Sequence, residues 1–413
     1  MTTTLQAPRI RSVAGSLLGR VAVRVVTAGA SRLRVGRLTV AFPNGSIRTY
    51  GDSDAEDRAV VHIHDRRAFV RMLLGGEMGA GEAYVDGLWS SPDLAALLRL
   101  AALNRESLAL TDGWFRLPVQ MQRTVAHRLR RNTRQQSRRN ISKHYDLGND
   151  FYRLWLDETM TYSSAVFASP DQSLADAQRT KYARIADGAE LTKGMHVLEI
   201  GSGWGGFAIH AAGTIGCRVT SITISQRQHD LARARVKEAG LEHLVDIQLR
   251  DYRDVTGTYD AVVSIEMLEA VGAEYFTTFF QACSDALVPG GRMSLQTITV
   301  PDAGYARQAG GANWIQTYIF PGGLLPSLAV IERALHRTGL VVRQVDDIAD
   351  SYVRTLRAWR ARFMARADDV RAQGFDDRFI RTWEYYLALS EAGFASGVTQ
   401  DLQVVLEKRR PSG

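Results

Sequence analysis

The most chemically informative stretch of the sequence is a glycine-rich turn that follows a short apolar run. The run at 196–200 ends in Glu199 and Ile200, and Gly201, Gly203 and Gly206 follow at once. Glycine is needed where a ligand approaches the backbone closely or where φ is positive. The spacing Gly-x-Gly-x-x-Gly also matches a dinucleotide-binding fingerprint, although that match alone carries little weight. A bound ligand explains four glycines within six residues better than a simple strand–helix turn does.

Residues near this turn distinguish between the candidate ligands, a dinucleotide and S-adenosylmethionine. A nicotinamide cofactor needs an acidic residue at the end of the next strand to bind its ribose, and residues 223–226 read Thr-Ile-Ser-Gln. A diphosphate is also a poor neighbour for the carboxylate of Glu199. S-adenosylmethionine carries an ammonium and a sulfonium group and no phosphate. The sequence therefore favours a methyl donor over a dinucleotide.

Alternating strand-like and helix-like segments surround the turn. A short apolar run predicts a strand at 196–200, and 218–224, 245–249, 261–265 and 292–300 are further strand candidates. Helical patterns at 225–239 and 274–287 lie between them. This alternation is typical of a doubly wound, mostly parallel sheet that binds ligands at the carboxyl ends of its strands. We predict an α/β domain at 144–413.

A smaller N-terminal α+β domain is predicted at 1–105. Apolar residues at helical spacing predict a helix at 10–25, alternation around Pro43, Asn44 and Gly45 predicts a hairpin at 33–51, and 60–64 reads as a strand. The first helix is basic as well as amphipathic, so it fits either its own domain or an anionic membrane. A basic helical linker at 106–143 joins the two domains.

Positive charge is concentrated in this linker. The 413-residue chain has a net charge of +7, and residues 116–143 alone contain nine Lys or Arg and no Asp or Glu. Each such residue near an anionic leaflet contributes about 1 kcal/mol. The segment has no Phe, Tyr or Trp to stack on bases. We predict that it docks on anionic membrane phospholipids, and a solvated helix face is the alternative.

The composition of the sequence limits the cellular compartments in which the protein is expected. Two cysteines, Cys217 and Cys283, cannot build a disulfide framework or a Cys-rich zinc site, and we predict no metal site. The sequence has no run of 18 apolar residues. Arg20 and Arg24 interrupt the apolar stretch that a signal peptide would need. We expect a cytoplasmic protein, peripheral on the inner face of the membrane.

Longer motifs then point to one family. In chain order these are HYDLGNDFY at 144–152, MTYSS at 160–164, the glycine turn, DYRD at 251–254 and YIFPGG at 318–323. With these motifs, residues 140–410 resemble the cyclopropane-fatty-acyl-phospholipid synthase family. The resemblance implies a class I methyltransferase fold. It also implies methyl transfer from S-adenosylmethionine to the double bond of a phospholipid acyl chain.

The resemblance assigns residues to each part of the methyl donor. Tyr162 and Ser163 are expected at its methionine part, beside Glu199, Gly201 and Gly203. The residues expected near the ribose are Thr223, Ile224 and Gln228, and those expected to frame the adenine are Asp251, Tyr252 and Arg253. Without the resemblance, Tyr252 reads as a core aromatic residue.

Methylation of an alkene also needs a dry site, groups that stabilise a carbocation and a base that removes a proton. The resemblance implies a bound bicarbonate as that base, held by Glu269, Tyr352 and the backbone of Ile298. Ser164 stands where many family members carry Cys, and Gln296 where many carry His. Serine can keep a backbone contact, whereas glutamine can hydrogen-bond an anion but cannot carry a proton charge.

The sequence leaves alternatives open for both the reaction product and the class of function. The position of the removed proton relative to the cation decides between a cyclopropane and a methylene branch, and a reductase partner would convert the latter to a methyl branch. A nucleic-acid methyltransferase that grips phosphates through 116–143 is a second reading, and a non-catalytic lipid carrier a third. A homodimer is also compatible with the sequence.

Overall fold

A computed structural model of the chain describes residues 17–108, 147–309 and 313–410. Two compact units divide the chain. The first comprises Met1–Gln122 and Asp377–Tyr385, and the second comprises Arg123–Asp376 and Tyr386–Gly413. No pattern in the sequence indicated that residues near 380 return to the first unit. Most of the linker predicted at 106–143, including its basic segment, lies outside the described residues.

The first unit is an α+β domain. Its four-stranded sheet has the order β2-β1-β3-β4. The strands are β1 (Arg37–Ala41), β2 (Ile47–Gly51), β3 (Arg58–Ile63) and β4 (Trp89–Ser90), and the helices are α1 (Leu17–Ala30), α2 (Arg67–Val85), α3 (Leu94–Leu103) and α4 (Arg105–Leu108). The antiparallel β1–β2 pair is the predicted hairpin, with Gly45 at φ +80° in its turn. Residues 10–16 of the predicted first helix lie outside the described residues.

Residues of helix α17 (Asp377–Ala395) complete this unit. The hydroxyl of Tyr84 donates to Glu384 at 2.6 Å, and the guanidinium of Arg381 donates to the carbonyl of Tyr84 at 2.9 Å. The rings of Tyr84 and Tyr385 lie 5.5 Å apart. These contacts explain why a segment so distant in sequence belongs to the N-terminal unit.

The second unit contains a seven-stranded sheet of order β10-β11-β9-β8-β5-β6-β7. Its strands are β5 (His196–Ile200), β6 (Arg218–Thr223), β7 (Val245–Leu249), β8 (Tyr259–Ile265), β9 (Leu287–Thr299), β10 (Leu340–Asp347) and β11 (Gln400–Lys408). Strands β5 to β9 pair in parallel, whereas β11 is antiparallel to both β9 and β10. This confirms the predicted α/β class and its mostly parallel sheet, and it adds two strands that we did not predict.

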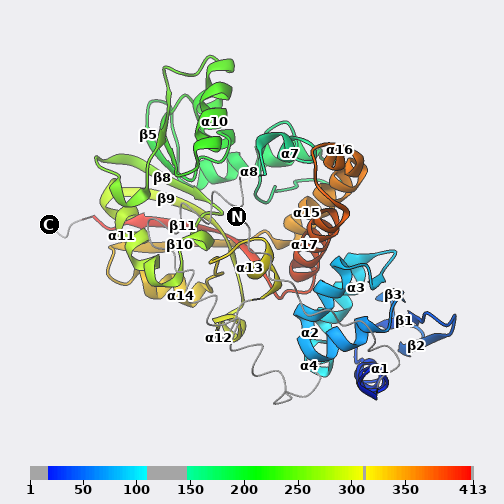
Figure 1. Ribbon diagram of the computed structural model, residues 1–413. Coiled ribbons are helices and arrows are strands. Elements are labelled where there is room, and N and C mark those ends of the chain that lie inside the picture. Colours follow the sequence, from blue (N-terminus) through cyan, green and yellow to red (C-terminus); the bar gives the residue numbers. More distant parts are fainter. Residues whose placement is uncertain (1–16, 109–146, 310–312, 411–413) are drawn as a thin grey trace. The chain divides into compact units, whose positions relative to one another are not determined.

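Helices cover both faces of this sheet (Figure 1). One core packs α8, α9 and α10 against the sheet, and the other packs α11 and α14. The helices are α7 (Asn149–Arg153), α8 (Leu174–Gly188), α9 (Gly206–His210), α10 (Gln226–Glu238), α11 (Phe276–Ala286), α12 (Asp302–Ala309), α13 (Trp314–Tyr318), α14 (Leu328–Leu335), α15 (Ala349–Ala365), α16 (Ala367–Ala372) and α17, with a π turn at Ala211–Ile215 and 3₁₀ turns at Tyr252–Asp254, Leu268–Ala270 and Ala273–Tyr275.

The strand order fixes where a ligand can bind. Strand β5 lies between β6 and β8, so the chain leaves β5 on one side and later returns on the other. Ligands of open α/β sheets bind at such a switch point, beyond the carboxyl ends of the strands. The glycine turn of residues 201–206 begins there.

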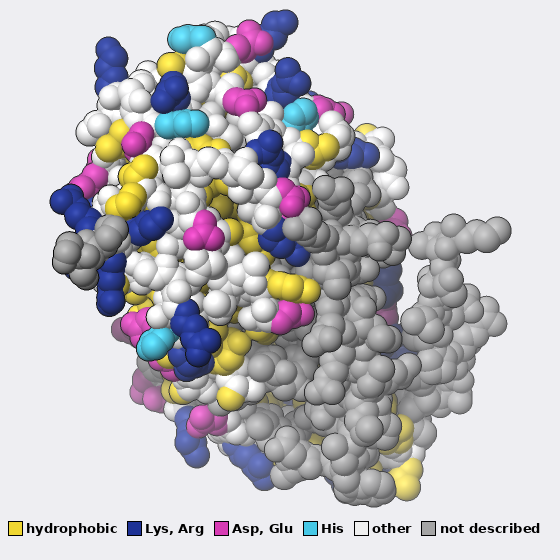
Figure 2. Space-filling view, turned by 90° about the vertical axis from the view of Figure 1, so that its left-hand side faces the viewer, with side chains coloured by type: hydrophobic (Ala, Val, Ile, Leu, Met, Phe, Trp, Pro, Cys, Tyr) yellow, Lys and Arg dark blue, Asp and Glu magenta, His cyan; other side chains and the backbone are white. Residues whose placement is uncertain are grey.

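The helices and the surface charge of the described residues bear on the expected membrane association. None of their helices is long and apolar enough to span a membrane. On the face that Figure 2 shows, Lys and Arg side chains lie among Asp and Glu side chains. Charge on this face is mixed, so it does not create the one-signed field that a polyanion would favour.

Candidate functional site

The glycine turn after β5 leaves open space above its backbone. Gly203 has φ +49°, and a Cβ atom built on it would meet nothing within 4 Å. Gly206 is different, because a Cβ atom there would come 2.2 Å from the hydroxyl oxygen of Tyr182. Gly206 is therefore required by packing, whereas Gly203 allows a ligand to approach the main chain.

A buried acid lies just before the turn. Glu199 is 2% exposed and accepts a hydrogen bond from the hydroxyl of Ser221 on the neighbouring strand β6. Burial raises the pKa of this carboxyl to about 8, and the hydrogen bond from Ser221 opposes the shift. A carboxyl group here disfavours a diphosphate and is compatible with a cationic ligand.

The predicted ribose neighbours meet at the carboxyl end of β6. The hydroxyl of Thr223 donates to the side-chain oxygen of Gln228 at 3.0 Å and accepts from the amide of Ser225 at 3.1 Å. Ile224 is half-buried between them. No carboxylate stands at this strand end, which matches the sequence argument against a nicotinamide cofactor.

The predicted adenine neighbours lie after β7 and are held together by one ion pair. The carboxylate of Asp251 accepts from Nε and Nη2 of Arg253 at 2.8 and 2.6 Å. The same guanidinium lies 5.3 Å from the ring centre of Tyr252, whose edge packs on Phe279 at 5.4 Å. Tyr252 is thus also a packing residue, as expected without the resemblance.

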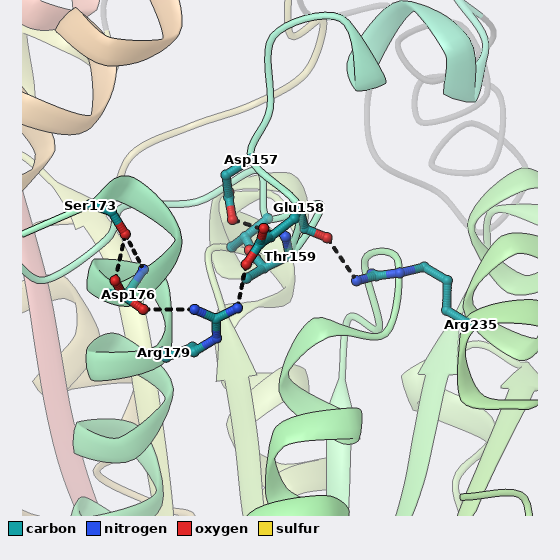
Figure 3. A network of polar contacts seen from close by, with 8 residues as sticks. Asp157, Glu158, Thr159, Ser173, Asp176, Arg179 and Arg235 are labelled. Atoms are coloured by element: carbon teal, nitrogen blue, oxygen red, sulfur yellow. Dashed lines mark hydrogen bonds and ion pairs between the residues drawn. The ribbon is translucent and has the colours of Figure 1, made fainter. Parts of the chain in front are cut away.

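A polar network fixes the segment that leads into Tyr162, Ser163 and Ser164 (Figure 3). Arg179 of α8 forms ion pairs with Glu158 and with Asp176. Arg235 of α10 donates to the backbone carbonyls of Glu158 at 3.3 Å and Trp204 at 2.6 Å. Two helices therefore hold this segment close to the glycine turn, which contains Trp204.

Tyr162 lies in a cluster of aromatic rings. Its hydroxyl lies 2.9 Å from the hydroxyl of Tyr386. Its ring centre lies 5.4 Å from those of Tyr152, Trp155 and Trp359, and 6.5 Å from that of Phe320. Aromatic faces attract cations and exclude water, so this cluster suits a cationic donor and a cationic intermediate.

Three of the residues predicted to hold bicarbonate surround the carboxylate of Glu266. This residue directly follows β8. Its Oε1 accepts from the amide of Ser164 at 2.7 Å and from Nε2 of Gln296 at 2.8 Å. Its Oε2 accepts from the hydroxyl of Tyr352 at 2.8 Å. These three predicted residues therefore lie together around an acid, Glu266, that was not among the predicted site residues.

The other two predicted residues, Glu269 and Ile298, form a second contact close by. Oε1 of Glu269 accepts from the amide of Ile298, and from the hydroxyl of Thr297 at 2.9 Å. Its Oε2 is buried without a hydrogen-bond partner. Burial, followed by the charge of Glu266, raises the pKa of Glu269 to about 8. Glu269 therefore has a free oxygen and a tendency to hold a proton.

Two further charged residues, Lys181 and Asp401, also escaped prediction. The ammonium of fully buried Lys181 donates to the hydroxyl of Ser163 at 2.7 Å, and burial lowers its pKa to about 8. Asp401 of β11 accepts from Nε2 of Gln296 at 3.1 Å, and burial raises its pKa well above the usual range. Both are fully buried, and a buried ionisable group with a shifted pKa is a signal of function.

Together these residues suit chemistry on a cationic donor. The turn offers open space and a buried carboxyl group, as S-adenosylmethionine requires, and the aromatic cluster and acids lie beside it. In the described part of the chain, no group of three or more His, Cys, Asp or Glu is placed to hold a metal ion.

Comparison with known proteins identifies the family. The model of the family described as mycolic acid cyclopropane synthetase matches residues 132–404, which is more than half of the chain. The chain belongs to this family. The family consists of S-adenosylmethionine-dependent lipid methyltransferases, and the chain is a methyltransferase of this type.

Individual relatives agree with this assignment. Tuberculostearic acid methyltransferase UfaA1 of Mycobacterium tuberculosis is 44% identical over 84% of this chain and 83% of its own length. Cyclopropane-fatty-acyl-phospholipid synthase of Escherichia coli is 32% identical over 86% and 89%, respectively. Among solved structures, the mycolic acid cyclopropane synthase CmaA1 with SAH and CTAB has a TM-score of 0.62 at 28% identity. That match covers 66% of this chain and 98% of CmaA1.

Proposed function

We propose that this methyltransferase adds a methyl group from S-adenosylmethionine to the double bond of an unsaturated phospholipid acyl chain, and that the product carries a methylene branch. The observation that carries the reaction type is the cluster of aromatic rings and buried carboxyl groups beside the glycine turn. The branched product is supported by the relative named for tuberculostearic acid, a methyl-branched acid.

The chain's own residues would act in three ways. When bound, S-adenosylmethionine supplies an electrophilic methyl group. The turn and the buried Glu199 would orient the donor, while the rings around Tyr162 keep water away from the reacting carbons. A cation near an aromatic face is stabilised by about 0.5–2 kcal/mol per ring. Carboxylates near the cation would add further stabilisation and accept the proton.

The product depends on whether hydride migrates before the proton leaves. If the cation stays on the neighbouring chain carbon, loss of a proton from the new methyl group closes a cyclopropane. If a hydride first moves to that carbon, the cation lies on the methyl-bearing carbon and the same proton loss leaves a methylene group. The relative from Escherichia coli is named a cyclopropane synthase, so the cyclopropane is the second candidate. A reductase partner would convert the methylene to a methyl branch.

Methyl transfer to the acyl chain can be measured directly. Purified protein is incubated with donor labelled in its methyl group and with anionic vesicles containing monounsaturated phospholipid. We expect label in the extracted fatty acids, and none when the vesicles contain only saturated chains. Absence of label from the unsaturated lipid, with donor binding verified by calorimetry, would refute the proposed function.

Access to the substrate requires a membrane surface. We propose that the basic segment at 116–143 binds anionic phospholipid headgroups on the inner face of the membrane. The concentration of nine basic residues without an acid supports this role.

A further inference from the structure

We propose that the carboxylate of Glu266 is the base that removes the proton, and that it occupies the place which the family resemblance assigns to bicarbonate. This inference rests on the proposed function, because it names the base of that reaction. The donors expected to bind a bicarbonate ion already donate to the side chain of Glu266.

The hydrogen bonds around Glu266 leave little for a second anion. Ser164 has one amide hydrogen and Tyr352 one hydroxyl hydrogen, and both point to Glu266 at 2.7 and 2.8 Å. Nε2 of Gln296 has two hydrogens, with acceptors in Glu266 at 2.8 Å and Asp401 at 3.1 Å. Its Oε1 accepts from Gln403 at 3.1 Å, which fixes the orientation of the amide. The residues present therefore do not fit bicarbonate at this position.

The backbone of Glu266 is in an unusual conformation. Its φ is +48°, one of three positive values among the non-glycine residues that the structure describes. A non-glycine residue in this region is strained and persists only where its surroundings enforce it. The amide of Glu266 donates to the carbonyl of Gln296 at 2.8 Å, which anchors the residue to strand β9. This conformation accompanies the placement of the carboxylate among its three donors.

The ionisable side chains of Lys181, Glu269 and Asp401 interact electrostatically with this carboxylate. Burial raises its pKa, and the ammonium of Lys181 on α8 is the largest opposing effect. Asp401 on β11 and Glu269 both have raised pKa values, in part because of Glu266. When these two acids hold their protons, Glu266 is the carboxylate that three donors and one cation stabilise as an anion. A raised pKa also makes that anion a stronger base.

The proposed step balances in atoms and electrons. The π electron pair of the alkene forms a bond to the donor methyl carbon, and the carbon–sulfur bond breaks with its pair retained on a neutral thioether. The acyl chain becomes a carbocation. Glu266 then takes a proton from the new methyl group. If a hydride has first moved from the methyl-bearing carbon to the neighbouring cationic carbon, the released C–H pair forms the methylene double bond. Without that hydride shift, the pair forms the third cyclopropane bond. Glu266 later returns its proton to solvent.

The experiment compares bicarbonate dependence in the intact protein and in substituted forms. Rates of label transfer are measured in CO₂-free buffer and with added bicarbonate. Glu266→Gln keeps the shape of the side chain and removes the base. Glu266→Gly opens the space that the carboxylate fills. Glu190→Gly is the matched control, because Glu190 also has a positive φ (+51°) but is exposed. Binding of ¹³C-bicarbonate is followed by NMR as a readout independent of activity.

We expect the unsubstituted protein to react equally fast with and without bicarbonate and to bind no ¹³C-bicarbonate. Glu266→Gln should lower kcat by at least about 100-fold, the usual contribution of a general base, while donor affinity stays within about threefold. Glu266→Gly should gain ¹³C-bicarbonate binding, and Glu190→Gly should not.

A rate that falls in CO₂-free buffer, bicarbonate bound by the unsubstituted protein, or an unchanged kcat in Glu266→Gln would each overturn the proposal. If no lipid is labelled at all, the proposed function fails. The NMR binding experiment still decides whether Glu266 fills the bicarbonate position.

Discussion

Substitution of Glu269 by glutamine should change how stability depends on pH. The carboxyl group of Glu269 is buried beside Glu266, and its pKa is raised from an ordinary value of 4.5 to about 8. Between these two values the folded protein holds a proton that the unfolded chain has released. Stability is therefore lost as pH rises through this window. One pKa unit corresponds to 1.36 kcal/mol, so this group alone removes about 3 kcal/mol between pH 5 and pH 7.

Urea unfolding at pH 5, 6 and 7, followed by tryptophan fluorescence, measures this effect. Glutamine has no proton to release, so the free energy of unfolding of Glu269→Gln relative to the unsubstituted protein should increase by about 3 kcal/mol from pH 5 to pH 7. The same change at exposed Glu242 is the control and should stay within about 0.5 kcal/mol. Parallel pH profiles for the unsubstituted protein and Glu269→Gln would show that Glu269 does not hold a proton in the folded state.

Other predictions concern the donor site, the polar network and the membrane. Gly203→Ala should weaken S-adenosylmethionine binding at least tenfold by calorimetry, because a methyl group enters the open space above the turn. Gly257→Ala is the control, because Gly257 also has a positive φ (+92°) and open space around it but precedes the first residue of β8. This substitution should leave donor binding unchanged. Arg235→Ala should lower the free energy of unfolding by about 2 kcal/mol through its two backbone contacts. Arg179→Ala, which breaks more exposed ion pairs, should cost less than about 1 kcal/mol in the same assay. Neutralising basic residues of the linker should weaken binding to anionic vesicles and spare donor binding, and unchanged vesicle affinity would contradict the docking role. The residues to neutralise are Arg128, Arg130, Arg131, Arg138 and Arg139.

Local sequence patterns were sufficient to predict most strands of the second unit. Strands β5 and β7 begin and end where they were predicted. Four of the five residues of β5 are buried, whereas β7, at the edge of the sheet, alternates apolar and polar residues, and both patterns are visible in the local sequence. Strand β11 was missed because buried polar residues interrupt it, among them Asp401 and Gln403. Both contact Gln296, so the residues that hid the strand from prediction belong to the site.

The choice between Glu266 and Glu269 could not be made from the sequence. The resemblance pointed to Glu269, whereas the structure surrounds Glu266 with the amide of Ser164, Gln296 and Tyr352. An acid at the carboxyl end of a buried strand is a usable signal for a ligand-facing group. The direction in which the Glu266 side chain points, however, depends on the positive φ of Glu266 and on hydrogen-bond partners up to 102 residues away. Local sequence patterns encode neither.

The fate of the transferred methyl carbon tests the central claim most directly. Donor enriched with ¹³C in its methyl group is reacted with monounsaturated phospholipid vesicles, and the extracted fatty acids are analysed by ¹³C and ¹H NMR. We expect the label in a methylene carbon double-bonded to the acyl chain. A labelled cyclopropane carbon would establish the second candidate product. A fatty-acid fraction without label would contradict methyl transfer to the acyl chain altogether.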